Sequence, residues 1–148
     1  MAIRYETVDI QFPKIVKRRE TSAWIKQIVD QYQKRVGEIG YIFCDEAEIL
    51  RINNLFLQHD YYTDILTFDY SENDILSGDL FISLQTVKSN AEKYGINYPE
   101  ELYRVMIHGI LHLCGFNDKT PKDEKRMRQK EDEALRLFAF TPKILPRI

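Results

Sequence analysis

Two of the three histidines in this sequence, His108 and His112, stand four residues apart. That distance is close to one helical turn, so both imidazoles would lie on the same face of a helix. Gly115 follows and can end the helix in a left-handed turn, which glycine adopts at little cost. The chain would then reverse and bring Asp118 back toward the two rings. We therefore predict a metal site formed by His108, His112 and Asp118.

The cofactor predicted from these ligands is one Zn²⁺ per chain, because imidazole nitrogens and carboxylate oxygens are usual zinc ligands. Three protein ligands leave a fourth position for water, which is typical of catalytic zinc sites. The spacing resembles that of the metzincin proteases, with aspartate at the third ligand position. Those enzymes carry a glutamate base directly after the first histidine, where this chain has Gly109. The sequence thus argues against a peptidase and leaves the catalytic base unassigned.

Other interpretations of the histidines stay open. The helix expected around residues 105–114 is apolar on nearly every face, so both its histidines could be hydrogen-bonded core residues. The third histidine, His59, lies in a polar and aromatic segment that we expect to form a loop. His59 could complete the metal site in place of Asp118, contact phosphate, act as an acid or base, or have no role.

Length and composition restrict the class of protein. The chain has 148 residues, of which 44% are hydrophobic and 30% charged, as in an ordinary globular domain. The formal net charge of -2 argues against a protein that coats nucleic acid by bulk charge. We expect no secretory signal and no membrane span, because no apolar run approaches about 20 residues. The two cysteines, Cys44 and Cys114, fit a reducing compartment, so we predict a cytoplasmic protein.

The elements that must position the site alternate between strands and helices. Period-two and β-branched segments predict strands over 3–12, 41–44, 63–70 and 78–84, the last two forming a hairpin. Helical spacing predicts helices within 14–36 and over 46–55, 85–94, 99–114 and 121–138. We expect Gly37 and Gly40 to end the first helix and Asp45 to cap the second. The fold class is α+β: a single domain over 1–148, with a small mixed sheet of about four strands packed against helices and the metal site on a buried helix.

The residues around the histidines also resemble a known family. The segment 108–116 reads HGILHLCGF and is similar to the signature HGxLHLxG followed by Tyr or Phe in the YbeY family of bacterial endoribonucleases. Upstream, TDILTF over 63–68 and GDLFIS over 78–83 resemble two strands of that family. Downstream, Met127 and Glu131 match positions in its final helix. The likeness runs from about residue 48 to residue 135.

The resemblance implies a zincin-like fold with a single metal, expected to be zinc. It implies that the chain is a single-strand-specific endoribonuclease that matures the 3' end of small-subunit ribosomal RNA, with ribosomal RNA and the small ribosomal subunit as partners. Two alternatives remain. The chain could hydrolyse another substrate, as a peptidase would, or it could be a non-catalytic ribosome-assembly factor with a structural metal.

Two positions depart from the family pattern. The signature usually ends in Asp-His, the histidine being the third ligand, whereas this chain has Asn117 and Asp118. Aspartate would make the site more anionic and less selective for zinc. The family also has an arginine, expected to contact phosphate, where this chain has Leu57. His59, Arg51 and Arg104 are possible replacements.

Basic residues also flank the metal motif. They are either RNA contacts or one side of ion pairs on a solvated helix: Lys119, Lys122, Lys125, Arg126, Arg128 and Lys130.

Overall fold

A four-stranded mixed sheet and five helices form the part of the chain that the computed structural model describes, residues 2–57 and 63–138. The order of elements along the chain is β1 (Ala2–Thr7), α1 (Arg18–Gln31), β2 (Arg35–Cys44), α2 (Glu46–Leu57), β3 (Ile65–Asp69), β4 (Ile75–Ser83), α3 (Leu84–Tyr94), α4 (Tyr98–Leu113) and α5 (Pro121–Arg136). The predicted α+β class and the mixed sheet of four strands are confirmed.

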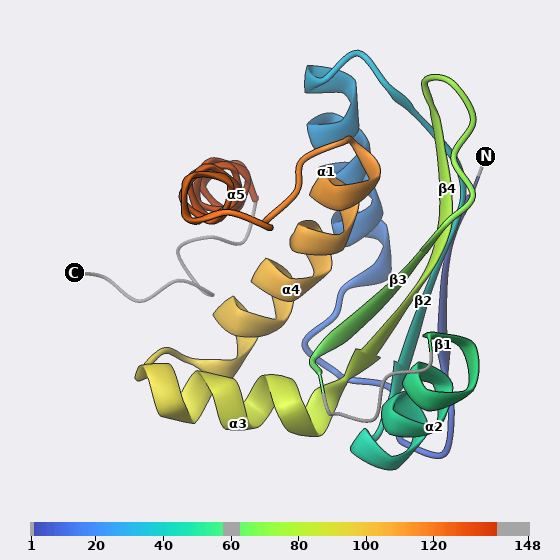
Figure 1. The fold of residues 1–148 in the computed structure, drawn as a ribbon, viewed down its shortest axis with the longest axis vertical. Helices are drawn as coiled ribbons and strands as arrows, with labels where there is room; N and C mark the ends of the chain where they lie inside the picture. Colours follow the sequence, from blue (N-terminus) through green and yellow to red (C-terminus); the bar gives the residue numbers. More distant parts are fainter. Residues whose placement is uncertain (1, 58–62, 139–148) are drawn as a thin grey trace.

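The strands lie in the order β1-β2-β4-β3. Strands β1, β2 and β4 run parallel to one another, and β3 pairs antiparallel with β4 as the predicted hairpin partner. β3 therefore forms one edge of the sheet. Figure 1 shows this edge strand running beside β4, and its Ile65 lies against Gly109 of α4.

Helices cover both faces of the sheet because successive side chains of a strand point to opposite sides. Leu80 and Ile82 of β4 belong to the large core beneath α1 and α4, whereas Phe81 packs on a smaller core with Ile49 of α2. Figure 1 shows α1 and α4 on the first face, with α5 on the outer side of α4, away from the sheet. Helix α4 therefore lies between the sheet and α5.

Helix α4 is held firmly in this layer. At its start, the Asn97 side chain accepts a hydrogen bond of 2.9 Å from the Glu100 N–H, and Pro99 occupies the first turn. Further along, the buried Tyr41 hydroxyl of β2 donates to the Met106 carbonyl at 2.8 Å. Gly109 faces the sheet, since a Cβ there would lie 3.0 Å from Ile65 and 3.2 Å from Leu80. These contacts hold the backbone of α4 against the sheet.

Helix α5 is attached to the rest of the molecule through aromatic residues. The indole N–H of Trp24 on α1 donates to the Ala134 carbonyl on α5 at 2.7 Å. The Trp24 ring also packs on Phe138, just beyond α5, with ring centroids 4.7 Å apart. These contacts set α5 against α1 and α4.

The first half of the chain differs from the sequence prediction in two places. Gly37 and Gly40 do not end the first helix; they lie inside β2, which is much longer than the predicted strand over 41–44. The helix ends at Gln31, and Gln33 reverses the chain with a φ of 60°. The first strand ends at Thr7 instead of residue 12, because Asp9 has a left-handed φ of 58°.

The other predicted elements are confirmed with small shifts of their ends. Asp45 caps α2 as expected, accepting a hydrogen bond of 2.8 Å from the Glu48 N–H. Gly95 ends α3 with a φ of 69°. The predicted loop that contains His59 lies outside the described residues. Among the helices that the structure describes, none is long and apolar enough to cross a membrane.

Candidate metal centre

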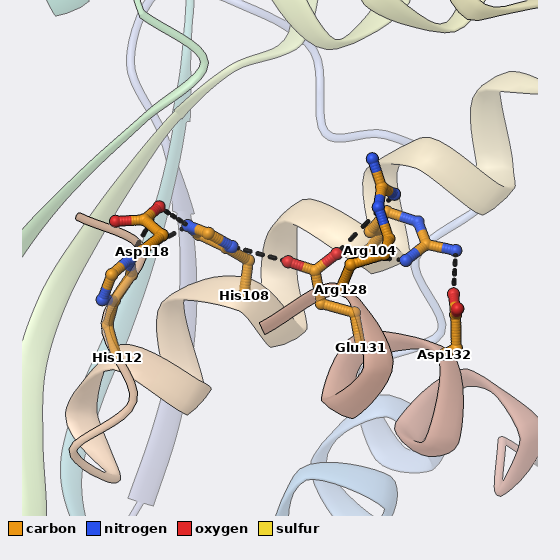
Figure 2. Close-up of polar contacts among 7 residues, drawn as sticks. All are labelled: Arg104, His108, His112, Asp118, Arg128, Glu131 and Asp132. Carbon is orange, nitrogen blue, oxygen red and sulfur yellow. Dashed lines mark hydrogen bonds and ion pairs between the residues drawn. The ribbon is translucent and has the colours of Figure 1, made fainter. Parts of the chain in front are cut away.

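The three residues predicted to bind a metal lie together at the end of α4. His108 and His112 occupy the last two turns of the helix, and Asp118 lies in the segment before α5. One ligand atom from each residue lies within 4.8 Å of the others. Figure 2 shows both rings turned toward the Asp118 carboxylate.

The turn after α4 brings Asp118 to the histidines. Gly115 has a φ of 107°, in the region that favours glycine. The Gly115 N–H donates to the His112 carbonyl and the Phe116 N–H donates to the Leu111 carbonyl, both at 3.0 Å. These bonds satisfy carbonyl groups at the helix end and reverse the chain. The expected role of Gly115 is confirmed.

The donor atoms suit a small divalent cation. The two Nε2 atoms lie 3.0 Å apart, and Asp118 Oδ2 lies 3.4 Å from Nε2 of His108 and 3.5 Å from Nε2 of His112. In a tetrahedral site with bonds of about 2.0–2.1 Å, neighbouring ligand atoms are roughly 3.3 Å apart. The arrangement is therefore close to the triangular face that three zinc ligands form.

Glu131 of α5 contacts the other side of the His108 ring. Its Oε2 lies 2.6 Å from Nδ1 of His108, as Figure 2 shows. Burial alone would lower the pKa of His108, but the hydrogen bond and charge of Glu131, together with the charges of Asp118 and Asp64, raise the pKa above its ordinary value. The pKa of His112 is lowered by burial and then by the neighbouring His108. The two rings thus differ in their affinity for a proton.

A cluster of charged residues surrounds Glu131. Arg104 of α4 reaches Glu131 Oε1 at 3.0 Å and Asp132 at 2.7 Å, and lies 3.8 Å from Glu100. Arg128 approaches Glu131 at 3.7 Å, with 58% of its side chain exposed. Arg104 is therefore committed to carboxylates, whereas Arg128 faces solvent beside the site.

Cavities open on both sides of His108. On the side of β3, a cavity of about 620 Å³ is bordered by residues 63–67, Asp69 and all three predicted ligands. On the side of α5, a cavity of about 480 Å³ is bordered by His108 and Asp118 together with Lys125 and Arg128. The His108 and His112 side chains are 21% and 28% exposed and border these cavities. The site is thus open to a substrate.

The other sequence candidates lie elsewhere. Arg51 is on α2, in an exposed ion pair of 2.8 Å with Glu48. Leu57 is the last residue of α2, and His59 lies outside the described residues. Sequence reasoning gave Glu131 no role, although a signal exists. This carboxylate stands in the buried stripe of a highly charged helix, among Met127, Ala134 and Leu135.

Comparisons with known proteins show which family this chain resembles. The family model described as Endoribonuclease YbeY matches residues 6–139. A protein named Endoribonuclease YbeY from Azobacteroides pseudotrichonymphae is 62% identical, over 91% of this chain and 96% of its own length. A protein of the same name from Bacteroides thetaiotaomicron is 56% identical, over 91% of this chain and 98% of its own length. The solution structure of TM1509 from Thermotoga maritima is similar with a TM-score of 0.67 and 27% identity, over 95% of this chain and 94% of the other.

Proposed function

Because the chain belongs to the YbeY endoribonuclease family, we propose that it is a metal-dependent endoribonuclease that cuts single-stranded RNA during ribosomal RNA maturation. The observation that carries the proposal is the convergence of His108, His112 and Asp118 in an accessible site. The region of the RNA that we propose as the substrate is the 3' end of small-subunit ribosomal RNA.

The three residues are proposed to hold one Zn²⁺. The donor set supports this, since two imidazole nitrogens and one carboxylate oxygen form three ligands and leave a position open. A divalent cation held there would polarise a phosphoryl oxygen and lower the pKa of its water. The openness of the site favours a catalytic role over a structural one, because structural zinc sites are closed by four protein ligands.

Basic residues beside the site support an RNA substrate. Lys125 and Arg128 border the same cavity as His108 and Asp118. These two basic side chains share the cavity with the carboxylates of Asp118, Glu124 and Glu131, and in a chain of net charge -2 they are the groups proposed to attract the phosphates. Arg128 is our proposed phosphate contact, because its ion pair with Glu131 is long at 3.7 Å, whereas Arg51 and Arg104 hold carboxylates at 2.8 Å and 3.0 Å.

A peptidase is disfavoured by the direction of Gly109. Zinc peptidases need a glutamate directly after the first histidine. Here that position is Gly109, which has no side chain and lies against Ile65 and Leu80 of the sheet. The site therefore lacks, at that position, the base that peptide hydrolysis requires.

The wider setting completes the proposal. Residues 1–148 act as one metallohydrolase domain, and the ribosomal small subunit is the proposed partner. A cytoplasmic location is supported by Cys44 and Cys114, which are both free thiols, as is usual in a reducing compartment.

The test is cleavage of single-stranded RNA by the purified wild-type protein, with and without a chelator, and by His112→Ala. We expect cleavage that is lost with chelator and in the variant. A wild-type protein that binds zinc but cuts no RNA would contradict the proposal. Co-purification with ribosomal subunits that is unchanged in His112→Ala, without cleavage by either protein, would favour the non-catalytic assembly factor.

A further inference from the structure

A continuous chain of polar contacts links α5 to the metal ligands. It runs from Arg104 through Glu131 to Nδ1 of His108, and from Nε2 of His108 to His112 and Asp118 (Figure 2). Glu131 lies at its centre, with only 7% of its side chain exposed. Each of its oxygens has a separate partner, His108 for Oε2 and Arg104 for Oε1.

The contact with Glu131 decides which nitrogen of His108 carries the hydrogen. A carboxylate oxygen can only accept, so Nδ1 must donate across the 2.6 Å contact. In the neutral ring, the lone pair is then on Nε2, which faces His112 and Asp118. Without Glu131, the hydrogen could move to Nε2 and the ring could rotate, and either change would remove a metal ligand.

Arg104 in turn holds Glu131. Its guanidinium spans Glu131 at 3.0 Å and Asp132 at 2.7 Å, two adjacent residues of α5. A planar guanidinium fixes the direction of both carboxylates more strictly than an ammonium could. Because Arg104 lies on α4, one turn before His108, it sets the position of α5 relative to the histidine that Glu131 contacts.

We propose that Glu131 is the positioning residue of the metal centre: it fixes the tautomer and the orientation of His108, and Arg104 acts only by holding Glu131. The inference rests on the proposed function, since it assigns His108 as a metal ligand. Carboxylates that orient a ligating histidine typically change metal affinity 10–100-fold when they are removed.

The first test measures zinc affinity by competition with a chromophoric chelator. We expect Glu131→Ala to bind zinc about 10–100-fold more weakly than the wild type. The zinc affinity of Glu131→Gln should lie between those of the wild type and Glu131→Ala, because its single amide oxygen can accept a hydrogen bond from His108 or from Arg104 but not from both. The matched control is Glu133→Gln on the same helix, whose carboxylate contacts Lys130 and is 43% exposed. Affinity of Glu131→Ala within twofold of the wild type would overturn the proposal.

The second test separates positioning through Glu131 from a general structural effect. If Arg104 acts only through Glu131, Arg104→Gln should weaken zinc binding in the wild-type background but add no further loss to Glu131→Ala, which removes the carboxylate that Arg104 holds. Additive losses would show that Arg104 acts on the site in another way. Should Glu131→Ala fail to fold, as judged by circular dichroism, the comparison of Glu131→Gln with Glu133→Gln decides the question.

The third test needs no metal. The measurement uses ¹⁵N nuclear magnetic resonance spectra of the zinc-free protein at a pH where the His108 ring is neutral. The ring should be the Nδ1–H tautomer in the wild type and a mixture of tautomers in Glu131→Ala. The same tautomer in both proteins would refute the assignment of Glu131. A wild type that shows the Nδ1–H tautomer but binds no zinc would instead contradict the metal centre of the proposed function, so the two failures are distinguishable.

Discussion

His108 and His112 stand one helical turn apart on α4, and their Nε2 atoms are 3.0 Å from each other. The rings are nearly perpendicular, at 83°, with their centroids 4.5 Å apart. Asp118 Oδ2 lies almost equally far from both nitrogens, at 3.4 Å and 3.5 Å. The three atoms therefore define one site and not two separate contacts.

The first prediction concerns Asp118. Asp118→Ala should bind zinc far more weakly than the wild type, because two histidines alone leave the ion mostly to solvent. Elemental analysis of protein purified without a metal-affinity tag measures the zinc content directly.

Asp118→His should keep about one zinc per chain, since imidazole is an equally suitable ligand. Glu124→Ala, which borders the adjacent cavity, is the control. Full metal content in Asp118→Ala would show that another residue is the third ligand, and His59→Ala would be measured next.

A second prediction concerns Gly109, which lies against the sheet. Alanine normally stabilises a helix by about 1 kcal/mol relative to glycine. Here the added Cβ would meet Ile65 and Leu80 at 3.0–3.3 Å, and overpacking of a core costs about 1–3 kcal/mol. Gly109→Ala should therefore lower the free energy of unfolding, measured by urea denaturation.

Ile65→Val provides the check for this interpretation, because it removes the Cδ1 atom nearest to the added methyl group. Gly109→Ala should cost less in the Ile65→Val background than in the wild type. An equal cost in both backgrounds would show that crowding against Ile65 is not the cause.

A third prediction concerns the pH dependence of stability. Glu101 is buried on α4, and burial raises the pKa of its carboxyl from 4.5 to about 7. Between these pH values the folded protein binds more protons than the unfolded chain, so stability falls as pH rises through this window. Glu101→Gln removes this loss. Its Tm should exceed that of the wild type above pH 7 and approach it below pH 4.5.

Glu92→Gln on α3 serves as the control for this experiment, because Glu92 is exposed. Its Tm difference from the wild type should not vary across the same pH range. A Tm difference for Glu101→Gln that is constant with pH would show that this carboxyl does not titrate in the window.

A fourth prediction concerns RNA binding beside the metal centre. Lys125→Gln and Arg128→Gln should each weaken the binding of single-stranded RNA and reduce its dependence on salt. Losing one phosphate contact lowers the slope of log affinity against log salt by about 0.7 for single strands. Fluorescence anisotropy in the presence of a chelator measures binding without cleavage. Lys88→Gln removes the same charge from α3 and should leave the slope unchanged, and equal slopes for all the proteins would refute the assignment.

The elements whose limits depend on local residues could be predicted from the sequence. Helix α4 follows from its apolar residues, from Pro99 in its first turn and from Gly115 after its end. The start of β2 could not, because glycines at residues 37 and 40 are also typical of a helix end. In the structure a Cβ at Gly37 would lie 2.7 Å from the Ile75 side chain and 3.1 Å from the Leu76 carbonyl oxygen on the neighbouring strand β4. That reason for glycine exists only once the strands are paired.

The same distinction applies to the site. The spacing of His108 and His112 is a local property of one helix, and the sequence alone predicts that the two rings meet. Glu131 is 23 residues from His108, and their contact depends on how α5 packs on α4. A carboxylate within a buried stripe indicates that it has a partner, but the sequence does not say which one.

The attachment of α5 through Trp24 has a practical consequence. Trp24 is the only tryptophan in the chain, and its indole is buried against Ala134 and Phe138. Its fluorescence emission therefore depends on the seating of the helix that carries Glu131. A red shift would signal that α5 has moved away from α1 and exposed the indole to water. If a variant loses zinc while its Trp24 emission is unchanged, α5 is still in place and the defect lies in the arrangement of the metal ligands. Trp24 fluorescence therefore serves as a built-in control for the position of α5.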